Sequence, residues 1–130
     1  MLRLPRFATD TGAFRPGLDR IEALLDALGN PQRAFPAIHV AGTNGKGSTS
    51  SMAASVASAA GLRVGLHTSP HLLTLRERMR IGGVAAPASW LDAAVADLED
   101  ALETIGPSFF EASLALSLAY FRDHGVDLAV

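Results

Sequence analysis

Residues 39–48 read His-Val-Ala-Gly-Thr-Asn-Gly-Lys-Gly-Ser, and the rest of the chain is best understood from this stretch. The apolar run at 37–41 suits a buried strand, and residues 48–60 are long enough for a helix that Gly61 ends. A strand, a glycine-rich turn and a helix in this order are the usual context of a phosphate-binding loop. Glycines let backbone N–H groups approach an anion closely, and the start of the helix adds partial positive charge. The order of these segments therefore predicts a phosphate site.

Lys46 is the residue that favours a phosphate site over a plain glycine-rich connection. The turn departs from the common G-x-x-x-x-G-K-[ST] spacing, because only two residues separate Gly42 from Gly45 and Gly47 follows the lysine. Lysine and arginine together number 11, and Lys46 is the only lysine among them. A compact ammonium fits a tight turn around phosphates where a planar guanidinium does not. We expect Lys46 to reach the β and γ phosphates of a nucleotide, and the Ser48 hydroxyl to contact Mg²⁺.

The composition argues against several classes of protein. A chain of 130 residues with 48% hydrophobic residues can form one domain, or part of one, with a real core. It has neither the roughly 20 consecutive apolar residues of a membrane span nor the apolar run of a signal peptide. The absence of cysteine excludes disulfides, and a net charge of −2 argues against a nucleic-acid surface. We therefore expect a cytoplasmic protein that binds neither membranes nor nucleic acids.

The remaining segments alternate between helix and strand. Apolar residues at helical spacing, ended by glycine or proline, predict three further helices at 18–28, 89–105 and 108–124. Short apolar or alternating runs predict three further strands at 63–67, 76–81 and 126–130. Ser108 followed by Glu111 is a capping-box pattern, and residues 1–17 are expected to be mostly irregular. The alternation indicates an α/β fold with a parallel sheet and a right-handed crossover after the first strand.

The domain organisation follows from the same segments. Residues 1–36 form an N-terminal segment with one helix, and residues 37–130 form the α/β part that carries the glycine-rich turn. The sequence stops within the apolar strand predicted at 126–130, where natural domains seldom end. We therefore expect an incomplete N-terminal nucleotide-binding domain of a longer protein.

Four segments together carry a resemblance to a known family. They are Gly-Thr-Asn-Gly-Lys-Gly-Ser at 42–48, Thr-Ser-Pro-His-Leu at 68–72, Glu77-Arg78 and Phe109-Phe110-Glu111. In these segments the chain resembles folylpolyglutamate synthase and the bifunctional dihydrofolate synthase of the Mur ligase superfamily, from about Phe14 to Val130. The glycine-rich turn alone indicates only the superfamily, and the Ser-Pro-His-Leu segment makes the resemblance more specific. The resemblance implies a P-loop-type domain, the N-terminal part of a Mur ligase-like central domain, with the separate C-terminal domain absent.

The resemblance also implies a reaction. ATP phosphorylates a carboxylate of dihydropteroate or of a folate glutamate tail, and the amino group of L-glutamate then attacks the acyl phosphate. The implied cofactors are ATP and Mg²⁺, and the parent protein is expected to be a monomer. The family supplies a Mg²⁺ carboxylate, a Mg²⁺ histidine and a modified lysine from segments that would follow Val130. We therefore expect these 130 residues alone to lack ligase activity.

The resemblance assigns roles to individual residues. The ATP-binding loop corresponds to Gly42, Thr43, Asn44, Gly45, Lys46, Gly47 and Ser48, with Lys46 as the catalytic residue. Ser48 and Ser69 match positions linked with Mg²⁺. The substrate-binding residues are expected to be Ser69, His71, Ser108, Phe109, Phe110 and Glu111, of which the last four match the pterin-binding segment.

Several of these assignments have a plainer alternative. Ser69 also suits a turn residue before a proline. Phe109 and Phe110 suit either stacking on a flat pterin ring or a place in the core, and Glu111 suits a helix cap. The arginines of 76–81 suit a solvated strand face.

Two other functions remain open at this point. Another Mur-type ligase, acting on a cell-wall precursor, would share the glycine-rich turn but not the Ser-Pro-His-Leu segment. A nucleotide-binding module without ligase activity would bind ATP and show no glutamate-dependent turnover. The sequence does not separate dihydrofolate synthase from folylpolyglutamate synthase.

Overall fold

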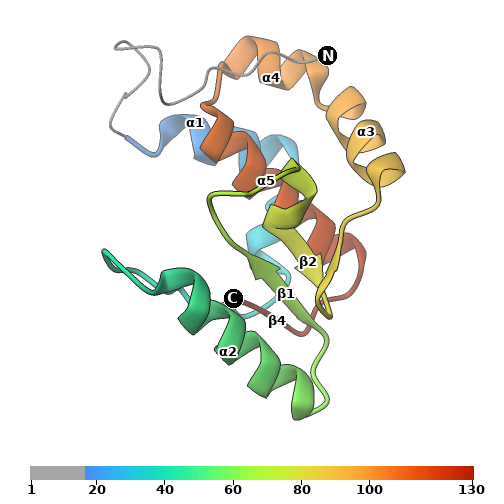
Figure 1. The fold of residues 1–130 in the computed structure, drawn as a ribbon. Helices are drawn as coiled ribbons and strands as arrows, with labels where there is room; N and C mark the ends of the chain where they lie inside the picture. Colours follow the sequence, from blue (N-terminus) through green and yellow to red (C-terminus); the bar gives the residue numbers. More distant parts are fainter. Residues whose placement is uncertain (1–16) are drawn as a thin grey trace.

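The computed structural model describes residues 17–130 and has a mixed four-stranded sheet at its centre (Figure 1). The structure predicted for residues 1–16 lies outside this range. The spatial order is β3-β2-β1-β4, with the bounds β1 Val64–His67, β2 Met79–Ile81, β3 Val84–Ala85 and β4 Leu128–Ala129. β1 pairs with β4 in parallel, whereas β1 with β2 and β2 with β3 are antiparallel. The predicted parallel sheet is therefore confirmed for β1 and β4 but not for β2 and β3. β2 and β3 form a hairpin across Gly82-Gly83, and a two-residue connection joins only antiparallel strands.

Helices surround this sheet. In residues 17–130 they are α1 Asp19–Ala27, η1 Pro31–Arg33, α2 Lys46–Ala59, η2 Leu75–Arg78, α3 Ala88–Asp97, α4 Glu99–Ile105 and α5 Phe109–Asp123, where η marks a 3₁₀-helix. The helices predicted at 18–28, 48–60 and 108–124 are confirmed within two residues at each end. The helix predicted at 89–105 divides at Leu98, and the first part of the strand predicted at 76–81 is η2. None of these helices is long and apolar enough to cross a membrane.

Residues 37–41 do not form the buried strand that their apolar sequence predicts. Ala37 makes a single parallel bridge to Ala129, and the Ile38 N–H donates to the Ala129 carbonyl at 2.8 Å. β4 therefore lies between this segment and β1, so the crossover through α2 passes over one intervening strand. Ile38 is 45% exposed, and β4 is the only strand of the described residues that this segment meets. The side chains of a strand are buried only where another layer of structure covers the faces of the sheet.

α5 is the most buried helix of the described structure, and it packs against β1. Alternate residues of a strand face the same side, so Gly65 and His67 face α5 while α2 covers the opposite side (Figure 1). The predicted capping box is confirmed, because the Glu111 N–H donates to the Ser108 hydroxyl at 3.2 Å and Glu111 accepts the Ser108 N–H at 2.7 Å. The fully buried side chains around α5 include Leu24, Met79, Leu116 and Phe121.

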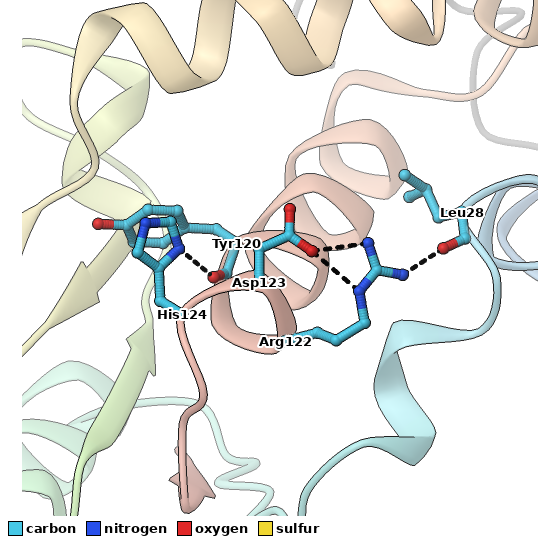
Figure 2. A network of polar contacts seen from close by, with 5 residues as sticks. All are labelled: Leu28, Tyr120, Arg122, Asp123 and His124. Atoms are coloured by element: carbon cyan, nitrogen blue, oxygen red, sulfur yellow. Dashed lines mark hydrogen bonds and ion pairs between the residues drawn. The ribbon is translucent and has the colours of Figure 1, made fainter.

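The last turn of α5 also holds the end of α1. Figure 2 shows the Arg122 guanidinium between Asp123, at 2.8 Å, and the Leu28 carbonyl, to which it donates a hydrogen bond. Leu28 is the C-cap of α1, where backbone carbonyls lack partners within the helix. On the same turn, His124 Nδ1 lies 2.8 Å from the Tyr120 carbonyl, and the two rings are 4.3 Å apart. Polar contacts thus add to the apolar packing of α1 on α5.

We predict that Gly65→Ala destabilises the protein by about 1–3 kcal/mol, because a Cβ there must displace a packed ring. The added carbon would meet Phe121 ring atoms at 2.6 Å, and Phe121 is fully buried. Urea unfolding followed by circular dichroism measures the change. Gly47→Ala is the matched control, because its Cβ would meet nothing within 4 Å. Equal unfolding midpoints for Gly65→Ala and the wild type would refute this close packing.

Candidate phosphate and substrate site

The glycine-rich turn ends at the first residue of α2, and it is exposed. Gly45 is the N-cap with φ of +76°, a left-handed conformation that strains residues carrying a Cβ. No side chain caps α2, so the first N–H groups of the helix are free to meet an acceptor. Lys46 Nζ donates to the Gly42 carbonyl at 2.7 Å and lies 3.4 Å from the Thr43 carbonyl. An ammonium group and free backbone N–H groups therefore occupy the same short turn.

A cavity of about 600 Å³ lies beside this turn. Gly42, Lys46 and Gly47 line it on one side, and Ser69 of the Ser-Pro-His-Leu segment lines it as well. Phe110 at the start of α5 faces the same cavity and is 39% exposed. The other lining residues are Ala37, Ile38, His39, Val40, Ala41, Ser50, His67, Thr68, Leu114, Leu118, Phe121, Ala129 and Val130. Residues from three separated segments of the predicted site thus share one cavity.

The two serines expected at Mg²⁺ both have free hydroxyl groups. Ser48 is exposed on the first turn of α2, and Ser69 is exposed at the edge of the cavity. Neither hydroxyl makes a hydrogen bond within residues 17–130. No cluster of three or more histidine, aspartate or glutamate residues suited to a metal occurs in that range. Within the described residues, a Mg²⁺ ion would be held by hydroxyl oxygens, with water or phosphate completing its shell.

Glu111 lies apart from the cavity and already has partners. Its side chain is largely buried, accepts the Ser108 N–H and forms an ion pair with Arg20 at 3.2 Å. Burial acts to raise the pKa of Glu111, but the hydrogen bonds from Ser108 and Arg20 outweigh it and hold the pKa below its usual range. Of the residues expected to bind substrate, Ser69 and Phe110 line the cavity, whereas His71, Ser108, Phe109 and Glu111 do not.

Arg78 is a buried cation, so the alternative that the arginines of 76–81 lie on a solvated strand face is wrong for this residue. It is 7% exposed, donates from Nε to His71 Nδ1 at 2.9 Å, and has its Cζ 5.1 Å from the centre of the Phe109 ring. Burial lowers its pKa, yet a guanidinium stays protonated in proteins. The signal in the sequence is the capping box formed by Thr74 and Glu77, which makes Arg78 the end of a turn.

His67 is a second site residue that sequence reasoning missed. Its Nδ1 lies 2.8 Å from the Ser117 hydroxyl, and its ring is 6.3 Å from the Phe110 ring at the cavity. Nε2 is buried and has no hydrogen-bond partner in the part of the chain that the structure describes. Burial first, and the charge of Arg78 second, lower the pKa of His67 to about 4, so the imidazole is neutral near pH 7. The available signal is its position at the carboxyl end of a strand that pairs in parallel, where α/β folds bind ligands.

Several proteins of known function are similar in sequence, although no family model matches the chain. The folylpolyglutamate synthase of Lacticaseibacillus casei is 44% identical in an alignment that covers 97% of this chain and 30% of that protein. The dihydrofolate synthase/folylpolyglutamate synthase of Mycobacterium tuberculosis is 39% identical in an alignment that covers 88% of this chain and 26% of that protein. The chain therefore spans less than a third of the length of these relatives.

Solved structures agree with the sequence matches. Folylpolyglutamate synthase from Thermotoga maritima superposes with a TM-score of 0.85 at 40% identity, over 90% of this chain and 29% of that one. The M. tuberculosis folylpolyglutamate synthase in complex with ADP superposes with a TM-score of 0.84 at 38% identity, over 91% of this chain and 29% of that one. A folylpolyglutamate synthase in complex with AMPPCP and folate superposes with a TM-score of 0.82 at 42% identity, over 98% of this chain and 32% of that one.

The class that this fold defines is the Mur ligase-like α/β proteins. Within that class, the sequence and structure matches consistently identify the chain as the counterpart of one part of the folylpolyglutamate and dihydrofolate synthases.

The pKa of His67 predicts a loss of stability in acid. An unfolded histidine has a pKa near 6.5 and the folded His67 one of about 4, so between these values the unfolded chain binds the proton. The contribution of the neutral His67 to the free energy of unfolding is on the order of 3 kcal/mol. It is fully present above the pKa of the unfolded state and is lost as the pH falls to the pKa of the folded state. Urea unfolding across this window should show a shallower pH dependence in His67→Gln. The exposed His39→Gln is the control, and a wild-type slope in His67→Gln would contradict the assignment.

Proposed function

We propose that this chain supplies the ATP phosphate turn and part of the pterin site of a ligase that joins L-glutamate to dihydropteroate or folate. The main observation behind the proposal is that the start of α2 has no side-chain cap. Lys46, at this start, and Ser69, from a separate loop, line the same cavity. The named activities of the relatives, and the ADP, AMPPCP and folate in their structures, support this nucleotide and this substrate class. Residues 37–130 would carry the α/β part and residues 1–36 its N-terminal extension.

Binding of the nucleotide would rest on the turn at 42–48. Free N–H groups at the start of α2 would donate to phosphate oxygens, and the positive end of the helix would favour their charge. Lys46 Nζ, which here contacts the carbonyls of Gly42 and Thr43, would balance the charge of the γ phosphate. Phosphoryl transfer depends chiefly on positioning and electrostatics, so the N–H groups of α2 and Lys46 would contribute to it by orienting the phosphates and balancing their charge.

The chemistry would run in two steps. A carboxylate oxygen of the pterin substrate attacks the γ phosphorus, and the bond to the ADP oxygen breaks, which leaves an acyl phosphate and ADP. The amino group of L-glutamate then attacks the acyl carbon, an amide bond forms, phosphate leaves, and the amine loses a proton. The free hydroxyls of Ser48 and Ser69 would hold Mg²⁺, which would offset phosphate charge when bound.

The pterin ring would stack on an aromatic side chain at the start of α5. Phe110 faces the cavity, and Phe109 lies beside His71, with ring centres 5.9 Å apart. The capping box of Ser108 and Glu111 would fix this segment rather than touch the substrate.

We predict that Lys46→Ala lowers glutamate-dependent ADP release by the full-length protein about a thousandfold or more, since a cation at the γ phosphate is worth several kcal/mol. Lys46→Arg should fail too, because a planar guanidinium does not replace a compact ammonium in a tight turn. A coupled assay for ADP measures both. Arg33→Ala, which removes an exposed cation elsewhere, serves as the control. Near-wild-type turnover in Lys46→Ala would reject the phosphate turn.

We predict that Ser48→Ala raises the Mg²⁺ concentration needed for half-maximal activity several-fold while leaving the unfolding midpoint nearly unchanged, because Ser48 makes no hydrogen bond in the described structure. Mg²⁺ titration of ADP release measures the first quantity. Ser51→Ala, also exposed on α2, is the control. An unchanged titration would mean that Ser48 is only a residue of the first helical turn.

A further inference from the structure

Arg78 is a buried cation with no acidic partner among residues 17–130. The ion pairs within residues 17–130 join Arg20 to Glu111 and Arg122 to Asp123, and neither includes Arg78. Its polar contacts are instead His71 Nδ1 at 2.9 Å from Nε and the Ser113 hydroxyl at 3.5 Å. A buried charge is costly unless other groups compensate it, so a cation kept here calls for a role beyond packing.

The contact with His71 determines where the histidine carries its proton. An arginine Nε always bears hydrogen and only donates, so His71 Nδ1 must accept and cannot carry a proton. The proton of the neutral imidazole is then on Nε2. Nε2 makes no hydrogen bond within residues 17–130 and is not among the buried unpartnered atoms of that range, so it reaches solvent.

Phe109 holds both partners of this contact in place. The Arg78 guanidinium lies over the Phe109 ring at 5.1 Å, and the His71 ring lies 5.9 Å from the same ring at an angle of 49°. Cation–π attraction favours this position of the arginine. The Ser113 hydroxyl donates to the Phe110 carbonyl at 2.9 Å, so its oxygen can only accept from Arg78. The orientation of the guanidinium is therefore set from two sides.

We propose that Arg78 is a positioning residue that fixes His71 as the Nε2–H tautomer. Ser69 lines the cavity and His71 does not, so the solvent-facing Nε2–H would offer a hydrogen-bond donor, and not an acceptor, to a pterin-bearing substrate that extends past Ser69. This inference rests on the proposed function for the identity of the substrate and for its contact with His71. A donor at this place favours a carbonyl oxygen or an unprotonated ring nitrogen of the substrate. Arg78 itself is not required to touch the ligand.

The tautomer is tested directly by NMR. The full-length protein is labelled with ¹⁵N in histidine and arginine, and long-range ¹H–¹⁵N spectra are recorded in mildly alkaline buffer, with His71→Gln to assign the signals. The expected result is the Nε2–H pattern for His71, together with a coupling across the hydrogen bond between Arg78 Nε and His71 Nδ1. A Nδ1–H pattern or a mixture of tautomers in the wild type overturns the proposal, whether or not the protein ligates glutamate.

Two variants test whether Arg78 is the cause. Arg78→Met keeps the packing on Phe109 but removes the donor, so His71 should become a mixture of tautomers. Ser113→Ala is the matched control, because it removes the other contact of the guanidinium and should leave the tautomer unchanged. A single Nε2–H form in Arg78→Met overturns the proposal, and the wild-type spectra decide the matter if that variant does not fold.

Kinetics test the functional part of the inference separately. In Arg78→Met the KM for the pterin-bearing substrate should rise about tenfold, the effect of one lost hydrogen bond, while the KM for ATP stays close to the wild type. Equal KM values for the pterin substrate in the two proteins would overturn the role of the tautomer in substrate recognition. Absence of ligation by the wild type would overturn the proposed function and leave the tautomer assignment standing.

Discussion

The close contact between Gly65 and Phe121 is the constraint on which the rest of the structure depends. A strand lies this near a helix only where a residue lacks a side chain, and the Phe121 ring fills the space that a Cβ would take. This contact fixes the distance between β1 and α5. It thereby sets His67 against Ser117, and it brings Phe110 to the cavity that the glycine-rich turn also lines. The absence of a Cβ at Gly65 thus determines how the sheet is placed relative to the cavity.

Much of the fold could be predicted because its signals are local. The stops at Gly61 and Gly125 and the capping box at Ser108 mark helix ends through short-range chemistry, and the structure places the helices there. The sheet could not be predicted in the same way. Whether residues 37–41 pair along their length depends on which strands flank them, and an apolar run carries no information about its neighbours.

In the candidate site, too, the local pattern could be predicted from the sequence and the buried residues could not. The turn at 42–48 is recognisable because glycine and a lone lysine have few other uses in that order, and the structure places it at the uncapped start of α2. His67 and Arg78 could not be found by pattern, because their importance comes from burial. One histidine at a strand end and one arginine among three look ordinary until the surrounding structure removes water from them.

The two carbonyl contacts of Lys46 have a consequence for the thermodynamics of ligand binding. A free lysine side chain gives up as much as about 2 kcal/mol of rotamer entropy when it is ordered. Here the ammonium group is already held by Gly42, at 2.7 Å, before any ligand arrives. Folding has therefore met part of that entropic cost, and a phosphate group competes with a carbonyl oxygen for an ordered ammonium. The turn thus contains a weak internal competitor, and the free energy needed to displace the carbonyl would be the same for every anion that binds there.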